Sequence, residues 1–492
     1  IYKVRNYLFA NVQRQDSDFF DKNSTGDLMT RLSGDLDMVR HSIAWIIKSI
    51  LECIVLYSAS VIFFFSIDWL MALCMIALTP VIFAITLAFR KVIGPRYVDL
   101  RDRLSAMNTG AEENISGNRV VKAFAREDRE IERYRVKNTD AFLINSRINS
   151  RIANTIPVIW TFYRIVNKLV FCLGAVLVIK GHILFGALSA LISYTEMAMD
   201  PINFFTWIGD RWAKCMDAAS RMFEIMDALP TVKEDEHPVH MENMRGDIEL
   251  KNVSFEYEAG HPIIKNVSFK VQAGHMFGIV GKTGAGKSTI INLMARLYDV
   301  TGGEITIDGV PIRKIAFDDL RRNIGIVSQE TFLFIGSIAD NIRYANPDAT
   351  MEEVIEAAKS ANAHEFITKL PEGYNTKVGE GGISLSGGEK QRISIARAII
   401  QKPNILILDE ATASMDTRTE QKIQAAIDNL KQGRTIISIA HRLSTLRDAD
   451  MLCVIENGEL KEMGTHDKLI KEKGKYFELY KLQSEALQFI NE

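Results

Sequence analysis

The sequence predicts two joined domains of different fold class, an all-α domain of transmembrane helices and an α/β domain built around a glycine-rich loop. The first half of the 492 residues carries long apolar runs, whereas the second half has the pattern of a soluble α/β domain. The glycine-rich stretch, 281–288, lies between a short apolar run and a helical pattern. A chain of this length is also expected to hold more than one domain.

Four apolar segments in the first half predict the transmembrane helices. Each is close to the ~20 residues that an α-helix needs to cross the hydrocarbon core of a bilayer. A helix in the core of a soluble protein rarely runs so long without a polar face. We therefore predict membrane spans at about 43–67, 69–89, 156–179 and 183–205.

The joins between these segments predict their orientation. Asp68 is almost all that separates the first pair, and residues 180–182 separate the second pair, so each pair forms a helical hairpin. The long connection from Arg90 to about Arg151 is rich in Lys and Arg, as is the segment before the first span. The positive-inside rule places both in the cytosol, which predicts a multi-pass membrane protein whose second half is cytosolic.

The charged residues inside the predicted spans can be explained in more than one way. Charges are costly in lipid and usually face a partner or a cavity. Lys48 and Glu52 stand four residues apart, so we expect them to pair on one helix face. Arg164, Lys168 and Glu196 are the candidates for a polar cavity within the membrane. Snorkelling to the interface or pairing between helices explains these three equally well.

A change of composition marks the boundary between the domains. Residues 221–245 turn charged and contain Pro230, Pro238 and the acidic run 234–236. Such stretches are typical of linkers. We predict a transmembrane domain over 1–220, a linker over 221–245 and an α/β domain over 246–492.

Composition limits what the chain binds and how it is cross-linked. The formal net charge is −2, so no nucleic-acid partner is expected. The 5 cysteines are odd in number and scattered, which argues against a disulfide framework and against a metal site. The sequence opens on Ile1 inside a helical pattern, without an initiator methionine, so we expect an N-terminally truncated chain.

The glycine-rich stretch reads as a phosphate-binding P-loop, because it has the strand–loop–helix context that this motif requires. Its backbone N–H groups can surround phosphate oxygens, and the N-terminus of the following helix favours negative charge. Lys287 is expected to reach the β- and γ-phosphates of ATP, and the Ser288 hydroxyl to bind Mg²⁺. The predicted ATP-binding residues of this segment are Gly281, Lys282, Thr283, Gly284, Ala285, Gly286, Lys287, Ser288 and Thr289.

Polar residues follow three other apolar runs of the α/β domain. Gln329 ends one of them and is well placed for a contact with Mg²⁺ or water. Asp409 and Glu410 end another; Asp409 can bind Mg²⁺ and Glu410 can orient or deprotonate the attacking water. His441 ends the third, where it is either structural or a sensor of the γ-phosphate.

Two further places carry candidate nucleotide-binding residues. The ring of Tyr257, between two predicted strands, either stacks on a base or fills part of the core. Ser386 has capping-box spacing with Glu389 at a predicted helix start. Gly387 and Gly388 cost that helix stability without improving its cap, and they are explained if backbone N–H groups must approach an anion closely.

These motifs, in this order, resemble those of the ATP-binding cassette (ABC) ATPases. The Leu-Ser-Gly-Gly element at 385–388 is the specific part, because other P-loop enzymes lack it. The first half resembles the membrane domain of bacterial multidrug and lipid exporters, and 19–26 and 116–124 resemble that family's two cytosolic loops. The family's half-transporter has six spans, so the resemblance implies an exporter-type helical domain with four of them present, fused to an ABC ATPase domain.

The resemblance implies further roles. Tyr257 would stack on adenine, and Gln329 would couple the Mg²⁺ site to the membrane loops. Ser386 and Gly388 would contact the γ-phosphate of ATP bound by a second subunit. The loop 414–416 would cross the dimer interface. The loop 376–380 would meet the membrane domain.

Together these features predict an ATPase that drives export of a small amphipathic substrate (drug, lipid or peptide) across the cytoplasmic membrane, as half of a homodimer or heterodimer. A lipid flippase and a regulatory half within a heterodimer are the alternatives. The regulatory half is disfavoured because Glu410 and the Leu-Ser-Gly-Gly element are intact. A soluble ATPase acting on DNA or the ribosome needs no span at 69–89, and importers of this superfamily usually carry the two domains on separate chains.

Overall fold

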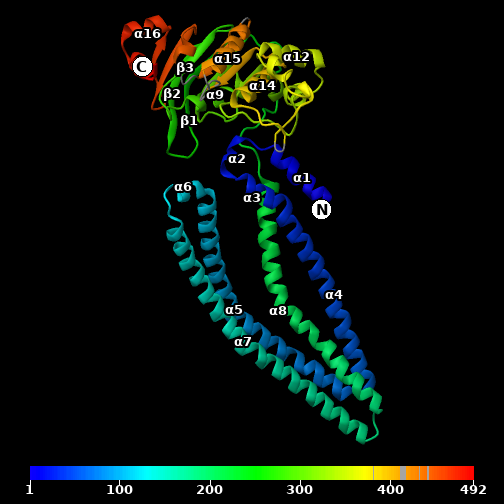
Figure 1. The fold of residues 1–492 in the computed structure, drawn as a ribbon. Helices are drawn as coiled ribbons and strands as arrows, with labels where there is room; N and C mark the ends of the chain where they lie inside the picture. Colours follow the sequence, from blue (N-terminus) through cyan, green and yellow to red (C-terminus); the bar gives the residue numbers. More distant parts are fainter. Residues whose placement is uncertain (380–381, 411–416, 432, 440–442, 492) are drawn as a thin grey trace. The chain divides into compact units, whose positions relative to one another are not determined.

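The computed structural model describes residues 1–379, 382–410, 417–431, 433–439 and 443–491 (Figure 1). They form two compact units. The first unit comprises Ile1–Val12 and Gly26–Asp227, and the second comprises Gln13–Thr25 and Ala228–Glu492. The division therefore falls inside the predicted linker, and a short N-terminal segment packs with the second half of the chain.

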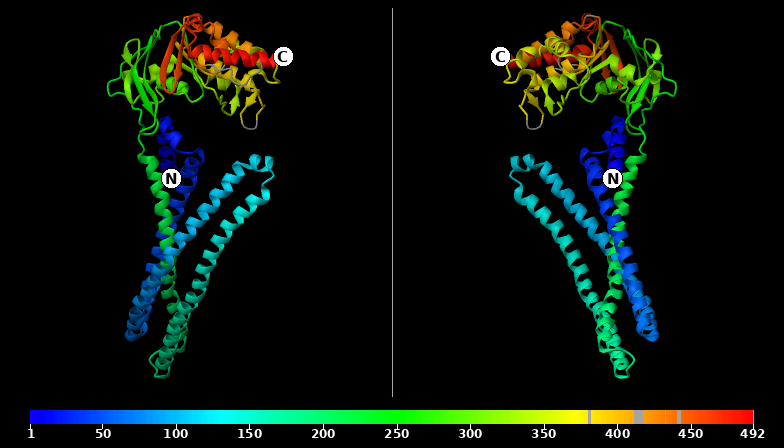
Figure 2. Two further views of the ribbon diagram at one scale, coloured as in Figure 1. Left: turned by 90° about the vertical axis from the view of Figure 1, so that its left-hand side faces the viewer. Right: turned by 90° about the vertical axis from the view of Figure 1, so that its right-hand side faces the viewer.

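The first unit is helical along its described length. Its elements, with the short α2 of the second unit in chain order, are α1 (Tyr2–Gln13), α2 (Ser17–Lys22), α3 (Thr25–Thr30), the π-helix η1 (Arg31–Asp35), α4 (Leu36–Ile67), α5 (Trp69–Ser116), α6 (Asn118–Ala123), α7 (Glu127–Ile179) and α8 (Phe185–Asp227). In both figures α5 and α7 run side by side, joined at one end by α6 (Figures 1 and 2). The long middle connection is thus helical, as an extension of the predicted spans.

The short joins form hairpin turns where the sequence predicts them. Asp68 is the single residue between α4 and α5, and its extended backbone breaks the helix. A buried apolar cluster holds the four long helices together near these turns; it contains Phe64, Met71, Ala72, Val166, Val170 and Leu191. Phe63 of α4 also stacks on Tyr194 of α8, with ring centroids 3.9 Å apart. The two hairpins therefore pack on each other instead of standing apart.

One helical stretch among the described residues, Thr25–Ile67, is long and apolar enough to cross a membrane. Only 11% of its most apolar 18-residue stretch is buried within the protein, so most of that apolar surface faces outward. The other predicted spans coincide with parts of α5, α7 and α8. The number of spans that cross the bilayer stays a prediction.

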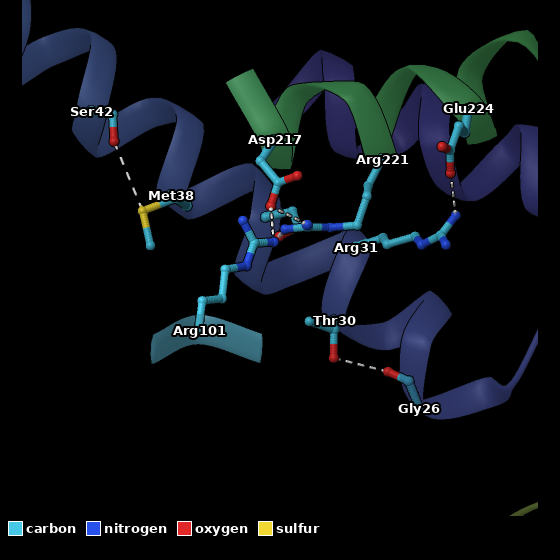
Figure 3. A network of polar contacts seen from close by, with 10 residues as sticks. Gly26, Thr30, Arg31, Met38, Ser42, Arg101, Asp217, Arg221 and Glu224 are labelled. Carbon is cyan, nitrogen blue, oxygen red and sulfur yellow. Dashed lines mark hydrogen bonds and ion pairs between the residues drawn. The ribbon is translucent and has the colours of Figure 1, made fainter. Parts of the chain in front are cut away.

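An ion-pair network ties three helical segments of the first unit together (Figure 3). Arg221 of α8 donates from Nε and Nη2 to the two carboxylate oxygens of Asp35, at 2.7 and 2.6 Å. Its Nη1 donates to Asp217 at 2.8 Å, and Arg101 of α5 donates to the same Asp217 oxygen at 3.1 Å. Asp35 is buried, and both it and Asp217 raise the pKa of Arg221 by hydrogen bonding, Asp35 the more strongly. Paired in this way, the buried carboxylate carries little of the cost that an isolated buried charge would have.

The second unit holds two main sheets. One is four-stranded, ordered β2-β1-β4-β5, and the other is six-stranded, ordered β12-β11-β3-β10-β9-β6. The strands are β1 (Ile248–Glu256), β2 (Pro262–Val271), β3 (Met276–Val280), β4 (Gly302–Ile307), β5 (Val310–Pro311), β6 (Ile324–Val327), β7 (Gly336–Ser337), β8 (Lys377–Val378), β9 (Ile405–Asp409), β10 (Thr435–Ile439), β11 (Met451–Glu456) and β12 (Glu459–Gly464). The short β7 and β8 pair with each other.

The helices of the second unit lie between and beside these strands (Figure 1). They are α9 (Lys287–Met294), η2 (Ile312–Lys314), α10 (Phe317–Asn323), α11 (Ile338–Arg343), α12 (Met351–Ser360), α13 (His364–Ile367), η3 (Gly373–Asn375), α14 (Gly387–Ile399), α15 (Thr417–Leu430), η4 (Leu443–Leu446), α16 (His466–Glu472) and α17 (Lys475–Asn491). The helices α11 to α14 fill the long segment between β6 and β9.

The central strands are buried on both faces. In β9, Ile405 and Ile407 belong to one apolar cluster, whereas Leu406 and Leu408 belong to a second cluster on the opposite face. A continuous apolar run is the expected pattern for a parallel strand covered by other layers on each side. β3, β6, β9, β10 and β11 are mutually parallel where they pair, so their carboxyl ends meet at one edge. The residues that follow these strands are therefore gathered at that edge.

Candidate nucleotide-binding site

The P-loop joins β3 to α9 and takes a backbone path that its glycines permit. Gly286 has φ = 100°, a left-handed conformation that favours glycine, directly before the first residue of α9. A Cβ at Gly281 would lie 2.3 Å from the carbonyl oxygen of Ile455 on β11. The loop is thus packed tightly on the sheet, and the N-terminus of α9 opens at the carboxyl edge of β3.

Lys287 is folded over this loop. Its Nζ donates to the carbonyl oxygens of Gly281 and Lys282, each at 3.1 Å, and the residue is 7% exposed. Burial lowers the pKa of Lys287, and the carboxylates of Glu410 and Asp409 act in the opposite direction. The ammonium therefore lies partly desolvated inside the loop, beside carboxylates, which is a suitable place for a phosphate-binding cation.

Ser288 and Asp409 bring two oxygen ligands together from distant parts of the chain. The Ser288 hydroxyl donates to Oδ1 of Asp409 at 3.4 Å. Burial raises the pKa of Asp409, the hydrogen bond from Ser288 lowers it, Glu410 raises it and Lys287 lowers it. A hydroxyl beside a carboxylate is a donor set that suits Mg²⁺, which prefers hard oxygen ligands and keeps several waters.

Glu410 and Gln329 form the second close pair of the site. Nε2 of Gln329, two residues after β6, donates to Oε2 of Glu410 at 2.6 Å. Glu410 follows β9 with φ = 48°, is 8% exposed, and donates its backbone N–H to the carbonyl of Ile439 at 3.0 Å. A left-handed glutamate is uncommon, so the end of β9 is constrained to aim this side chain at the strand edge.

Tyr257 lies just after β1 and keeps a partly exposed ring. The ring is in edge contact with Phe255 and Tyr298, with centroids 4.8 and 5.2 Å apart, and 38% of the residue is exposed. Its hydroxyl donates to Oγ1 of Thr289 at 3.4 Å. Tyr257 is therefore anchored beside the start of α9 with surface left for a stacking partner.

Ser386 begins α14 with the capping box that the sequence predicts. Its hydroxyl accepts from the backbone N–H of Glu389 at 3.4 Å, and the Glu389 carboxylate accepts from the backbone N–H of Ser386 at 2.8 Å. A Cβ at Gly387 would meet no atom within 4 Å. The backbone N–H and hydroxyl of Ser386 are thus satisfied by the cap, and the surface at Gly387 is open among the described residues.

Two family comparisons cover most of the chain. The ABC transporter transmembrane region family matches residues 2–202, and the ABC transporter family matches residues 264–413. An ABC transporter ATP-binding protein of Bacillus subtilis is 36% identical over 505 residues, which is 100% of this chain and 84% of that protein. The chain belongs to the ABC transporters.

Other relatives of this ABC transporter are named for lipid flipping or for export. It is 36% identical to an ATP-dependent lipid A-core flippase of Syntrophus aciditrophicus, over 98% of this chain and 80% of that protein. A Staphylococcus aureus relative named for multidrug export is 37% identical over 98% of this chain and 84% of its own length. A solved bacterial Atm1-family ABC exporter with ATP bound superposes with a TM-score of 0.81, at 29% identity, over 98% of this chain and 84% of that one.

These matches confirm the main expectations. The chain is a transmembrane exporter domain fused to an ABC ATPase domain, and it is a half-transporter that couples ATP hydrolysis to export across a membrane. It is embedded in a membrane with its ATPase domain in the cytosol.

The transporter's predicted site residues are only partly brought together. The structure gathers Lys287, Ser288 and Asp409, and separately pairs Gln329 with Glu410. His441 and the loop 414–416 lie outside the described residues, as does the last residue of 376–380. Their roles stay predictions, as does the part of Gln329 in binding metal.

Sequence reasoning missed one residue of this neighbourhood. Tyr298 packs edge-on against Tyr257 and donates its hydroxyl to Asp21 of α2 at 2.5 Å. Tyr298 follows the P-loop helix in a segment with no motif, and Asp21 precedes it by 277 residues. No local pattern links two such positions, so only the fold could reveal the contact.

Proposed function

We propose that this exporter works in the cytoplasmic membrane as one half of a dimer, homomeric or heteromeric, and moves a small amphipathic substrate. ATP would be held between the P-loop of one half and the Ser386–Gly388 segment of the other. Closure of the two ATPase domains on ATP would turn the membrane halves outward, and hydrolysis would reset them. The phosphates would supply the differential affinity for the closed state that a driven conformational change requires.

The hydrogen bond between Gln329 and Glu410 is the observation that carries the hydrolytic part of this proposal. It holds a buried carboxylate at the edge where the P-loop opens, one residue beyond Asp409. A carboxylate in that position can accept a proton from the attacking water. Gln329 would fix its orientation, and we assign Glu410 as the general base.

The remaining roles in the reaction are assigned to separate groups, most of them on the P-loop and at the end of β9. Lys287 would exchange its two loop carbonyls for the β- and γ-phosphates of ATP. Ser288 and Asp409 would hold Mg²⁺, which neutralises phosphate charge when bound. Tyr257 would stack on adenine, and His441 would sense the γ-phosphate.

The open surface at Gly387 supports a role for a second subunit. The capping box already satisfies Ser386 within its own chain, and no described atom lies within 4 Å of a Cβ placed at Gly387. A helix N-terminus with exposed N–H groups favours a phosphate. The γ-phosphate of ATP held by the other half is the partner we assign to it.

The substrate class rests on the membrane domain. Arg164 and Lys168 line one hollow of about 270 Å³ on α7 together with Ile165 and Leu169, so charged and apolar groups alternate there. Glu196 instead accepts a hydrogen bond from Asn167 at 3.4 Å, between α8 and α7. The hollow itself is apolar, and basic groups stand beside it on α7; we assign an amphipathic substrate on this neighbourhood of apolar surface and charge.

Substitution of Glu410 by Gln tests the assigned general base. We expect the full-length Glu410→Gln protein to bind ATP, to accumulate as a closed dimer in its presence, and to lose nearly all turnover. Steady-state hydrolysis and nucleotide retention after gel filtration would report both effects. Glu330→Gln, next to Gln329 on the same loop, is the matched control and should hydrolyse ATP at close to the normal rate. Near-normal hydrolysis by Glu410→Gln would rule out the assignment.

A further inference from the structure

A basic pocket lies between α5 and α7 of the first unit, and none of its lining residues belongs to the hollow at Arg164. It encloses about 510 Å³ and is lined by Arg96 and Asp99 from α5 and, from α7, by Arg147 and Arg151. Ser146 and Ser150 add hydroxyl groups to its wall. We call the site formed by Arg96, Arg147 and Arg151 the arginine pocket.

The three arginines of this pocket have no anionic partner among the described residues. Nη1 of Arg96 is buried and makes no hydrogen bond there. Asp99, the carboxylate of the lining, is already paired with Arg103 at 3.7 Å, and Arg103 also contacts Asp140 at 3.6 Å. The pocket therefore has an excess of positive charge, and one of its guanidinium nitrogens is desolvated without compensation.

Several other arginines on the same helices do have carboxylate partners. Elsewhere on the same helices, Arg101 pairs with Asp217, and Arg133 and Arg135 pair with Glu130 and Glu132. The three arginines of the pocket differ from other arginines without a partner because they line one hollow and because Nη1 of Arg96 is buried without a hydrogen bond. Guanidinium groups suit phosphate because their planar N–H donors match its oxygens.

The position of the pocket along the helices indicates where its ligand comes from. Arg96 is seven residues beyond the predicted span that ends at Phe89, which is roughly 10 Å along an α-helix. Arg151 is five residues before the span that begins at Ile156, roughly 7 Å away. These distances place the guanidinium groups at or just beyond the headgroup layer on the cytosolic side. Ile144 and the buried Ile148 give the same pocket an apolar wall.

We propose that the arginine pocket binds the phosphate headgroup of an anionic membrane lipid. Basic pockets between transmembrane helices on the cytosolic side are suited to such headgroups. The arginines would each donate to phosphate oxygens, and Ser146 and Ser150 would donate from their hydroxyls. The site is separate from the transported substrate, so it stands whether or not the substrate proposed above is correct.

Lipid retention by the full-length exporter tests this site. The protein is purified in detergent, exchanged into nanodiscs of phosphatidylcholine with or without phosphatidylglycerol, and its bound lipid is counted by native mass spectrometry. We expect wild-type protein to retain phosphatidylglycerol over phosphatidylcholine. Arg96→Gln, Arg147→Gln and Arg151→Gln should each weaken retention about fivefold, the effect expected for one arginine near a lipid headgroup. The triple Arg→Lys variant should keep part of it, because charge remains and the planar donor pair is lost.

A matched control separates the pocket from general charge. The variant R119Q/R126Q/R129Q removes the same number of exposed arginines from the far end of the same helical hairpin, and it should retain phosphatidylglycerol like the wild type. Equal loss in the control and in R96Q/R147Q/R151Q would overturn the proposal, as would full retention by the pocket variant.

Two further outcomes decide the chemistry of the ligand. Displacement of retained phosphatidylglycerol by excess inorganic phosphate would support recognition through the phosphate group. Tighter binding of inorganic phosphate than of phosphatidylglycerol would overturn the assignment to a lipid. Wild-type protein that retains no more phosphatidylglycerol than phosphatidylcholine would overturn the site itself.

Discussion

The hydroxyl of Tyr298 donates a hydrogen bond of 2.5 Å to the carboxylate of Asp21, and the same ring packs edge-on against Tyr257. One side chain thus touches both the ring assigned to adenine and the short helix α2 (Ser17–Lys22). The second anchor of this helix is Asp16, whose carboxylate caps α2 and accepts from the backbone N–H groups of Thr231 and Val232, at 2.5 and 2.9 Å. These contacts explain why residues 13–25 pack with the ATPase half.

Replacement of Tyr298 by Phe should loosen α2 without emptying the nucleotide site. Burial, and then the hydrogen bond to Asp21, raise the pKa of Tyr298, so its hydroxyl remains a donor at neutral pH. Loss of a hydrogen bond to a charged group costs roughly 1.5–3 kcal/mol. Hydrogen–deuterium exchange of the amides in α2 should therefore speed up. Tyr344→Phe, which removes a hydroxyl from an exposed tyrosine, is the control; equal exchange in both variants would contradict the prediction.

Substitution of Gly387 by Ala should leave the stability of one subunit intact and impair the closure of two subunits on ATP. The added methyl group meets no atom within 4 Å, and alanine is the better helix former, so the stability of the chain should be unchanged or slightly higher. In the proposed dimer the methyl would crowd the γ-phosphate. We expect the full-length variant to bind ATP normally while its two ATPase domains are apart. ATP-dependent closure of these domains and ATP hydrolysis should both be strongly reduced. Unchanged hydrolysis would argue against a second subunit at this helix start.

Asp409→Asn should abolish ATP hydrolysis and leave the nucleotide-free protein as stable as wild type or more stable. Burial raises the pKa of Asp409 above its ordinary value of 3.8, so the ionised carboxylate is destabilising in the nucleotide-free protein. That cost is present above the raised pKa and is lost as pH falls through it toward 3.8. The nucleotide-free variant should therefore melt at the same or a higher temperature than wild type at neutral pH, with the difference closing on acidification. Its Mg²⁺-dependent hydrolysis should be lost; a lower melting temperature at neutral pH would contradict this account.

Arg221→Ala should destabilise the membrane unit more than Arg101→Gln. Arg221 compensates Asp35, which is 6% exposed, whereas Arg101 contacts the half-exposed Asp217 from a side chain that is 72% exposed. Removing one partner of a buried pair costs roughly 3–5 kcal/mol, and the partial exposure of Arg221 should bring its effect toward the lower end. Thermal unfolding in detergent measures the order of the two variants. Equal melting temperatures would show that Asp35 finds another partner.

Lys48 and Glu52 should affect the stability of the membrane domain as a pair, so that losing one charge is worse than losing both. The two side chains lie 3.4 Å apart on α4, as their spacing predicts. Glu52→Leu leaves an ammonium without its partner in an apolar helix, so it should lower expression and thermal stability. K48L/E52L removes both charges and should recover most of the loss, because charges within a span are costly in lipid. A double variant less stable than the single one would assign these charges a role beyond pairing.

The sequence predicted the fold class, and it supplied the candidates for the nucleotide site, because both depend on local signals. The apolar runs, the one-residue join at Asp68 and the strand–loop–helix context of the P-loop each depend on neighbours in the chain. The capping box of Ser386 and Glu389 is likewise a pattern four residues long, and the structure confirms it. The order of the motifs then identified the ABC family.

Which distant side chains meet was decided by the tertiary structure. Parallel pairing of β6, β9, β10 and β3 brings Gln329 to Glu410 and Ser288 to Asp409. The contact of Tyr298 with Asp21 and the convergence of three arginines between α5 and α7 have no counterpart in any local pattern. Periodicity fixes which face of an element is apolar, but the pairing of polar groups across hundreds of residues depends on how the elements pack, and only the folded chain shows it.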